Sequence, residues 1–351
     1  MTMSNVPVYF RLDHAGFIGE GHLFRSKALA FKMKEAGFNP IFVTRPNFGF
    51  DSSRFLPFEV ITLKKVFEDN FRPADYLEWL GVSESGDVKE CLASTGHQKD
   101  CIWVVDHYGI GVKWEEEMSL QNQFIVVIDD LFRTHFADVV IDHNLTADSL
   151  MYKNKKNDPV YLMGPKYALL RDDICQAPQY EFSNDKKSSL LFLGSVEESL
   201  FYKFIMALRE FNLEHLTILN PPSNFNALSS EKILPFCNNL PELYSEQKMV
   251  FGSCGVAHLE RMALGVPSVT CVIVDNQIDV GLKTKELQIS HHLGDLRTLS
   301  IKDLGNSLKE VIKNPEILEE KALAGKKIIS LDGTKLITEA IEKKFKEWQS
   351  H

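Results

Sequence analysis

The segment RLDHAGFIGEGHLFRSKALA, residues 11–30, combines a glycine-rich loop with a histidine at the start of an amphipathic stretch. Gly16, Gly19 and Gly21 would let the backbone approach a ligand closely, and a following helix would turn its positive end toward an anion. His22 stands at that end, where the helix dipole disfavours a protonated imidazole. A neutral ring can accept a proton, so His22 is the candidate general base, with capping or packing as its alternative role.

Two charged residues precede this loop. Asp13 is assigned to the candidate catalytic group because it could orient the imidazole of His22, although it could also pair simply with Arg11 or Arg25. Arg11 is assigned to substrate binding, together with Gly19 and Gly21 of the loop.

A second segment with binding chemistry is FGSCGVAHLERMALGVPSVT, residues 251–270, which has the pattern strand, glycine turn, helix and strand. The amides of Gly255 and Val256 would face a phosphate at the helix N-terminus. Glu260, one turn into the helix, could accept hydrogen bonds from ribose hydroxyls or pair with Arg261. The remaining substrate-binding candidates at strand ends are Gly194, Ser195, Asn276 and Gln277.

Several carboxylates and histidines follow other apolar runs: Asp106, His107, Asp129, Asp142 and His143. They would form a metal site only if all of them converged, and their spacing has no tight ligand pattern. Capping and turn roles are therefore expected for the aspartates, and neither a metal nor a cofactor is expected.

Along the whole chain, short apolar β-branched runs alternate with amphipathic segments. Strands are expected to begin near residues 6, 40, 101, 124 and 138, and again near residues 190, 215, 248 and 267. A helix is expected over residues 23–36, stopped by Gly37. Such alternation indicates an α/β fold with doubly wound parallel sheets. A polar segment over residues 176–189 predicts a linker, which gives domains at 1–175 and 176–335 and a terminal helix at 336–351.

The composition of the chain argues against several classes of function. The 351 residues carry a formal net charge of −9, which argues against a general nucleic-acid binder. The six cysteines are scattered, as expected for reduced core thiols, and no apolar run or leader-like start predicts membrane insertion or export. A cytoplasmic monomer that acts on a small anionic substrate is expected.

Taken in order, these segments resemble the hydrolases that release UDP from UDP-2,4-diacetamido-2,4,6-trideoxy-β-L-altropyranose in pseudaminic acid biosynthesis. The resemblance runs from Arg11 to about Gly333. It rests on the loop of residues 11–25 and on the later motifs WLG (79–81), DHYG (106–109), IDDL (128–131), GPKYALLR (164–171), the segment 251–270, NQ (276–277) and DGT (332–334).

This resemblance implies a glycosyltransferase-B-like architecture related to the MurG transferases, with two Rossmann-like domains facing a cleft and no metal. It implies that His22 activates water and that Arg171 helps to hold the nucleotide. It implies further that Tyr108 lines the sugar site, and Tyr108 is assigned to the candidate catalytic group with His22 and Asp13. It also implies that Glu260 and Asn276 contact the substrate, which would be a UDP-sugar.

The chain departs from the family at two turns. It has Leu193–Glu197 where relatives carry Gly-Gly-Ser/Thr-Asp, and Val256 and Ala257 where relatives offer hydroxyl groups. Backbone amides can still bind a diphosphate, which leaves as a stable anion and needs no strong general acid. Three hypotheses follow: a UDP-sugar hydrolase, a glycosyltransferase of the same fold, and a sugar-nucleotide-binding protein without catalysis.

Overall fold

The computed structural model describes residues 5–350 except 16, 17, 19, 48, 69–72, 74, 184 and 212. Gly16 and Gly19 of the predicted glycine loop therefore lie outside the described residues. The chain divides into two compact units. Unit 1 comprises Met1–Arg171 and Asp332–His351, and unit 2 comprises Asp172–Leu331. The terminal helix, which the sequence left as a separate segment, thus belongs to unit 1.

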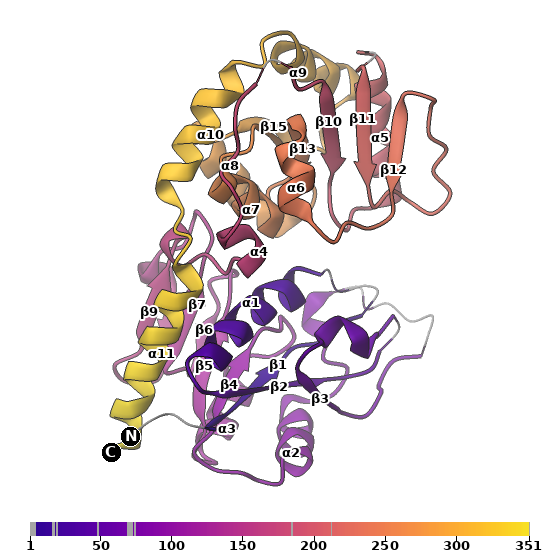
Figure 1. The fold of residues 1–351 in the computed structure, drawn as a ribbon. Helices are drawn as coiled ribbons and strands as arrows, with labels where there is room; N and C mark the ends of the chain where they lie inside the picture. The colour runs from indigo at the N-terminus through magenta and orange to yellow at the C-terminus, as the bar shows by residue number, and fades with distance from the viewer. Residues whose placement is uncertain are drawn as a thin grey trace. The chain divides into compact units, whose positions relative to one another are not determined.

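Unit 1 is built on a seven-stranded parallel sheet with the order β3-β2-β1-β4-β5-β7-β9 (Figure 1). Its strands are β1 (Pro7–Arg11), β2 (Asn39–Thr44), β3 (Glu59–Thr62), β4 (Ile102–Val105), β5 (Phe124–Ile128), β7 (Val139–Asp142) and β9 (Val160–Met163), with a small separate pair β6 (Thr134–His135) and β8 (Lys153–Asn154). Its helices are α1 (Gly21–Glu35), α2 (Glu84–Ser94), α3 (Val112–Ser119) and α11 (Gly333–Gln349), with short 3-10 turns η1 (Ser52–Phe55), η2 (Tyr76–Glu78), η3 (Ser149–Met151) and η4 (Pro165–Tyr167).

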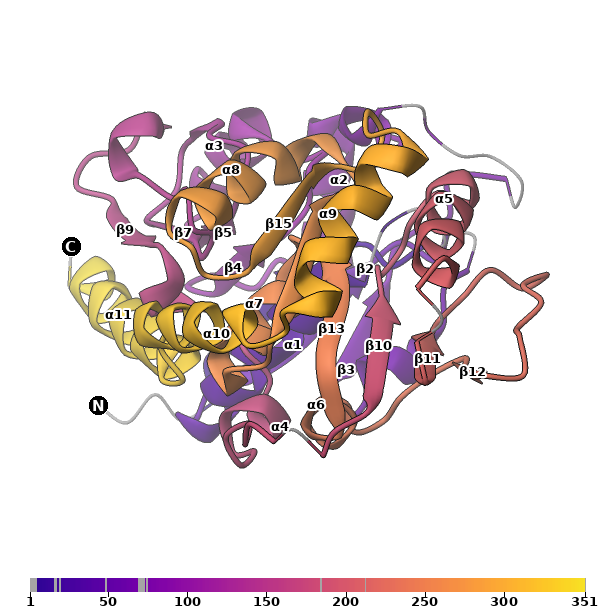
Figure 2. The same ribbon diagram turned by 90° about the horizontal axis from the view of Figure 1, so that it is seen from above.

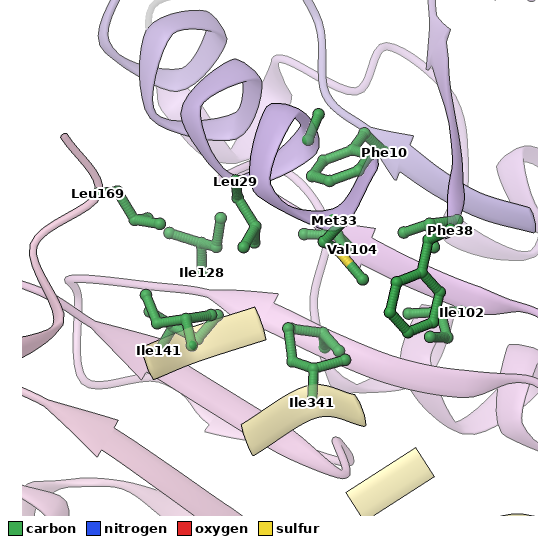
Figure 3. Packing of buried hydrophobic residues seen from close by; sticks show 14 of the residues in the cluster. Phe10, Leu29, Met33, Phe38, Ile102, Val104, Ile128, Ile141, Leu169 and Ile341 are labelled. Carbon is green, nitrogen blue, oxygen red and sulfur yellow. The ribbon is translucent and has the colours of Figure 1, made fainter. Parts of the chain in front are cut away.

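Helices cover both faces of this sheet, and alternation along the strands sorts the side chains between the two faces. Val8, Phe10 and Leu12 face α1 and α11, whereas Tyr9 faces α2 and α3. Figure 3 shows the first of these cores, where α1 and α11 lie against the strands. Its labelled residues are Phe10, Leu29, Met33, Phe38, Ile102, Val104, Ile128, Ile141, Leu169 and Ile341.

The first helix forms close to where the sequence predicts it. α1 spans Gly21–Glu35, and Gly37 follows its C-cap with φ of 95°, a conformation that a side chain would disfavour. The amide of Phe38 then donates to the carbonyl of Met33, which satisfies an otherwise unpaired carbonyl at the helix end.

The last helix depends on a glycine at its start. A Cβ at Gly333 would lie 2.3 Å from the carbonyl oxygen and 2.5 Å from the amide nitrogen of Ala168, so only glycine fits between α11 and the backbone after η4. This close approach gives the DGT segment a structural role, because it seats α11 on unit 1.

Unit 2 repeats the same strand arrangement, with the parallel order β12-β11-β10-β13-β14-β15. Its strands are β10 (Ser188–Phe192), β11 (His215–Leu219), β12 (Glu231–Leu234), β13 (Gln247–Ser253), β14 (Ser268–Val272) and β15 (His291–Asp295). Its helices are α4 (Asp172–Cys175), α5 (Glu198–Arg209), α6 (Leu240–Ser245), α7 (Val256–Leu264), α8 (Ile278–Glu286), α9 (Ile301–Lys313) and α10 (Ile317–Ile328), with the 3-10 turn η5 (Asp275–Gln277).

Helices α5 and α9 lie side by side on one face of the second sheet (Figure 2), and α7, α8 and α10 contact β13, β14 or β15. In each unit the first strand of the sheet is flanked by the second and fourth strands in chain order. This is the Rossmann order, in which ligands bind where the strand order reverses, at the carboxyl ends of the strands.

Candidate functional site

His22 lies beside the reversal point of unit 1. The reversal falls between β1 and β4, and α1 begins a short loop after β1. His22 is the second residue of α1, and Asp106 immediately follows β4 on the same face of the sheet as Val104. The topology therefore brings a histidine and a carboxylate together from positions 84 residues apart.

The two side chains form a short hydrogen bond. Nδ1 of His22 lies 2.6 Å from Oδ1 of Asp106, and the His22 residue is 8% exposed. Because a carboxylate can only accept, Nδ1 carries the proton and donates it, which leaves the lone pair of a neutral ring on Nε2. Among the described residues, none forms a hydrogen bond with Nε2 of His22.

Asp106 is held in place by two further residues of α1. Arg25 donates from Nε to Oδ2 at 2.8 Å and from Nη2 to Oδ1 at 2.6 Å, and the hydroxyl of Ser26 donates to Oδ2 at 3.0 Å. Burial by itself would raise the pKa of Asp106, but the charge of Arg25 and the hydrogen bonds from Arg25 and His22 lower it below its ordinary value. The carboxylate is therefore ionised at neutral pH.

A second carboxylate, Asp130, extends this network across the strand ends. It accepts from Nη1 of Arg25 at 3.2 Å, from the Tyr108 hydroxyl at 2.6 Å and from Nδ2 of Asn144 at 3.4 Å. Burial and the neighbouring charge of Asp130 raise the pKa of Tyr108 well above its ordinary value, so Tyr108 remains a neutral phenol. Arg25 thus lies between two carboxylates, of which Asp106 also binds His22 and Asp130 also binds Tyr108.

Aromatic rings line the histidine. The Tyr108 ring meets the His22 ring edge-on with centroids 4.6 Å apart, and Trp79 stacks on Tyr108 at 5.7 Å. Tyr76 of η2 contacts the Tyr108 ring at 5.5 Å and is 40% exposed. Aromatic rings beside polar groups are typical of small-ligand sites.

Arg133 holds the loop that carries Tyr108. Nη1 of Arg133 donates to the carbonyl oxygens of Tyr108 and Ile110, at 2.7 Å each, while its Nε donates to Asp129 at 2.6 Å. His135 lies between two carboxylates, with Nδ1 2.9 Å from a Glu115 oxygen and Nε2 3.6 Å from an Asp129 oxygen. Burial opposes protonation, but these two carboxylates raise the pKa of His135 to about 9.

Asp142 forms a different kind of buried contact behind the same loop. The Tyr152 hydroxyl lies 3.0 Å from Oδ2 of Asp142 and 3.0 Å from the Asp129 carbonyl oxygen. One hydroxyl proton cannot serve two acceptors, so both contacts are satisfied only if Asp142 is protonated and donates to Tyr152. Burial, assisted by the nearby charge of Asp130, raises the pKa of Asp142 to about 7.

The structure corrects the direct roles predicted for Arg11 and Asp13. Asp13 accepts from Arg11 Nη1 at 2.5 Å and contacts His107 Nε2 at 3.1 Å, and Arg11 also binds Asp87 of α2. Arg11 is fully buried and Asp13 is 2% exposed. They lie on the face covered by α2 and α3, whereas His22 lies on the face covered by α1, so neither reaches the imidazole.

The five strand-end residues considered as metal ligands have separate partners. Asp106 binds His22 and Arg25, His107 binds Asp13, Asp129 binds Arg133, Asp142 contacts Tyr152, and His143 accepts from the Leu169 amide. Within the described part of the chain, no group of three or more His, Cys, Asp or Glu side chains is arranged to hold a metal ion.

In unit 2 the predicted binding residues follow the carboxyl ends of three neighbouring strands. Gly194 and Ser195 follow β10, Gly255 and Val256 follow β13, and residues 276–277 follow β14, three strands that are neighbours in the sheet. Gly194 has a positive φ of 79°, and Nε2 of Gln277 lies 3.4 Å from where a Cβ of Gly255 would stand. These residues surround the reversal point between β10 and β13.

The other predicted residues occupy varied positions. Glu260 lies within α7 and is 5% exposed, whereas Asn276 is exposed. The guanidinium of Arg171 lies over the Phe24 ring of α1, with its carbon 5.3 Å from the centroid. Gly21 is the first residue of α1, and Gly19 lies outside the described residues.

Sequence reasoning did not assign Asp106, Arg25, Asp130 or Trp79 to the site. Strand alternation contained a usable signal, because Asp106 shares its parity with Ile102 and Val104 on one face, while Asp13 shares its parity with Tyr9 on the other. Which face α1 covers cannot be read from that alternation.

No family model matches the chain. A curated relative, the uncharacterized protein MJ1062 of Methanocaldococcus jannaschii, is 22% identical over 285 residues, which is 74% of this chain and 54% of the relative. The chain thus spans about half the length of the curated relative that it matches.

Solved structures resemble the chain over nearly its whole length. The glycotransferase of kitacinnamycin has a TM-score of 0.68 at 13% identity, covering 97% of this chain and 99% of that one. Acinetobacter baumannii MurG has a TM-score of 0.63 at 14% identity, with the same two coverages. A Listeria monocytogenes protein assigned as a UDP-N-acetylglucosamine 2-epimerase has a TM-score of 0.63 at 12% identity, covering 98% of each chain.

These similarities, together with the two Rossmann-ordered sheets, confirm the predicted fold class: the chain has two Rossmann-like α/β domains of the glycosyltransferase-B type. None of the helices in the described residues is long and apolar enough to cross a bilayer.

Proposed function

We propose that the chain is an enzyme that acts on a nucleotide sugar and hydrolyses it to a nucleoside diphosphate and a free sugar. The observation that carries this proposal is the pairing of His22 with Asp106 beside the strand reversal of unit 1. Nδ1 is committed to the carboxylate at 2.6 Å, and Nε2 is left to accept a proton.

In the proposed reaction, water gives a proton to Nε2 of His22 while its oxygen attacks the anomeric carbon. The bond between that carbon and the diphosphate oxygen breaks, and the diphosphate leaves with the electron pair. Asp106 stabilises the imidazolium that forms, and His22 then releases its proton to solvent. Attack opposite the leaving group would invert the anomeric configuration.

The amide turn after β13 in unit 2 supports nucleotide binding. The N-cap of α7 is Gly255, no side chain caps it and no acidic residue occupies the first turn. Such a helix end favours an anion such as a phosphate. Trp79 and Tyr76, which pack against the buried Tyr108 ring and are themselves partly exposed, could contact the apolar face of a sugar.

We further propose UDP as the nucleotide and a 2,4-diacetamido-2,4,6-trideoxyhexose as the sugar, the substrate class of the pseudaminic acid pathway. This finer assignment follows from the motif order described above. The similarity to a protein assigned as a UDP-N-acetylglucosamine 2-epimerase is consistent with a UDP-linked amino sugar.

The test is to incubate the full-length protein with UDP- and CMP-linked sugars and to follow the phosphorus resonances of the nucleotide by NMR. Release of UDP is expected with the wild-type protein and is expected to disappear in His22→Asn, while substrate still binds. His215→Asn changes an exposed histidine on β11 and serves as the control. Normal turnover by His22→Asn would exclude His22 as the base.

Glycosyl transfer is the second candidate, because the kitacinnamycin glycotransferase matches 97% of the chain. In that reaction an acceptor hydroxyl would replace water at the same base. Adding candidate acceptors to the assay separates the two reactions, because a transferase releases UDP only in their presence. Binding without turnover of any substrate would instead favour a sugar-nucleotide-binding protein.

A further inference from the structure

The buried arginines of unit 1 follow one rule, which concerns the groups that surround their charge. Each guanidinium that is withdrawn from solvent lies against carboxylates, as expected from the cost of burying an unpaired charge. The pairs are Arg11 with Asp13 and Asp87, Arg25 with Asp106 and Asp130, and Arg45 with Asp87 and Glu90.

Arg261 of α7 in unit 2 departs from this rule. It is 0% exposed, yet its recorded partners are uncharged: Nε donates to Ser268 Oγ at 3.1 Å, and Nη2 donates to the Ser253 carbonyl oxygen at 3.0 Å. Nη1 is buried without a hydrogen-bond partner. Among the described residues, no carboxylate lies within ion-pair distance of Arg261.

The fold makes room for this guanidinium at the carboxyl end of β13. A Cβ at Gly252 would lie 2.9 Å from Nη1, from Nη2 and from the Phe192 carbonyl oxygen of β10, so glycine at this position leaves room for both the guanidinium and the neighbouring strand. The bond to the Ser253 carbonyl then directs the guanidinium toward the turn that links β13 to α7.

The start of α7 adds no negative charge beside this guanidinium. The first turn of α7 contains no acidic residue, and Gly255 provides no capping side chain. His258, in the same turn, is buried with both ring nitrogens unpartnered. Burial, followed by the charge of Arg261, lowers its pKa well below the ordinary value, so His258 is a neutral ring. The helix end and the guanidinium together place positive charge beneath the turn.

We infer that Arg261 is a positioning residue for the diphosphate of the substrate, and that its buried positive charge makes the turn of residues 253–257 prefer a diphosphate over an uncharged nucleoside. The inference rests on the proposed function, since it concerns the same nucleotide. Arg261 acts through the turn and through its electric field, and the amides of the turn make the direct contacts.

The test measures affinities of the full-length protein for UDP, uridine and inorganic pyrophosphate by calorimetry. A buried unit charge within about 8 Å of a phosphate, at an effective dielectric constant of about 20, changes affinity by roughly 30-fold. Arg261→Gln is therefore expected to weaken UDP and pyrophosphate by about that factor, which is about 2 kcal/mol, and to leave uridine unchanged. Arg261→Lys keeps the charge and is expected to retain most of the preference for UDP.

Arg209→Gln is the matched control, because Arg209 is an arginine of the same unit that is already paired, with Glu231 at 2.8 Å. Thermal unfolding checks the fold of each variant. If Arg261→Gln does not fold, Gly252→Ala, whose methyl group would displace the guanidinium, is expected to reduce the same preference.

The outcomes separate this inference from the proposed function. A wild-type protein that prefers UDP to uridine, with an unchanged preference in a folded Arg261→Gln or Gly252→Ala variant, would overturn the role of Arg261 alone. A wild-type protein that binds none of the three probes would overturn the nucleotide function, and this inference with it.

Discussion

Replacing Asp106 by asparagine tests the pairing on which the proposed chemistry depends, and the chain contains a matched control. Asp106 binds His22 and the buried Arg25. Arg25 would remain paired with a second carboxylate, that of Asp130, after Asp106 is replaced. Asp13 has the same arrangement on the opposite face of the sheet. It binds His107 and Arg11, and Arg11 keeps Asp87.

The structure sets similar stability losses for the two variants. Asp106 accepts four hydrogen bonds, and an asparagine can accept at only one of its two terminal atoms. Removing one partner of a buried ion pair costs about 3–5 kcal/mol, and the carboxylate that remains beside each arginine favours the lower end. A loss of about 3 kcal/mol corresponds to roughly 6–12 °C in the midpoint of thermal unfolding of a unit of this size.

The variants should differ at His22. In Asp106→Asn the amide can donate to Nδ1 and stabilise the other tautomer, which places a proton on Nε2, where the proposed base must be free. Asp13→Asn leaves the bond between His22 and Asp106 intact. Hydrolysis is therefore expected to fall by about 10²–10⁴-fold in Asp106→Asn and by much less in Asp13→Asn.

The assay combines thermal unfolding, turnover and nitrogen NMR of protein labelled at histidine. The Nδ1 and Nε2 resonances of His22 are expected to change in Asp106→Asn and to remain unchanged in Asp13→Asn. An unchanged unfolding temperature in Asp106→Asn, or an equal change at His22 in both variants, would exclude Asp106 as the buried partner that sets the tautomer of His22.

Three further predictions concern stability. His135→Asn should destabilise the protein by about 3 kcal/mol more at pH 6 than at pH 10. The pKa of His135 is raised to about 9 in the folded protein, so its imidazolium contributes its full stabilisation below pH about 6.5. That stabilisation is lost as the pH rises through 9. Asp142→Asn should stabilise it by about 3 kcal/mol at pH 8 and little at pH 4. A pKa raised to about 7 makes ionisation costly as pH rises above about 3.9, and the amide can donate to Tyr152 as the protonated acid does. Gly333→Ala should cost about 1–3 kcal/mol or more, since its methyl group would overlap backbone atoms, whereas Gly305→Ala in α9 should be neutral or stabilising.

Urea unfolding at the stated pH values measures all three effects. A pH-independent loss in His135→Asn would show that the imidazolium contributes no ion pairing. Destabilisation of Asp142→Asn at pH 8 would show that the carboxylate is ionised in the folded protein. Equal stability of Gly333→Ala and the wild type would exclude the close approach that seats α11.

The strands that the sequence predicts and those that it leaves out differ in their place in the sheets. All nine predicted strands are inner strands, such as β4 and β13, which helices cover on both faces and which therefore read as continuous apolar runs. The edge strands of the two large sheets were not predicted: β3, β9, β12 and β15. All four are partly exposed. β3, β12 and β15 contain polar residues, whereas β9 is a short apolar run.

Local patterns in the sequence were enough to predict the α/β class, the helix that carries His22 with its glycine stop, and the strand-end positions of the candidate binding residues in the second sheet. Each depends on side-chain periodicity or on the conformations open to glycine within a short segment. The partner of His22 was a different matter. Asp13 is 9 residues away in the chain, but it points through the sheet to the face of α2 and α3, whereas Asp106 comes from a strand that only the sheet order places beside β1. Strand order and helix placement arise from packing between distant segments, and that packing decided which carboxylate meets the imidazole.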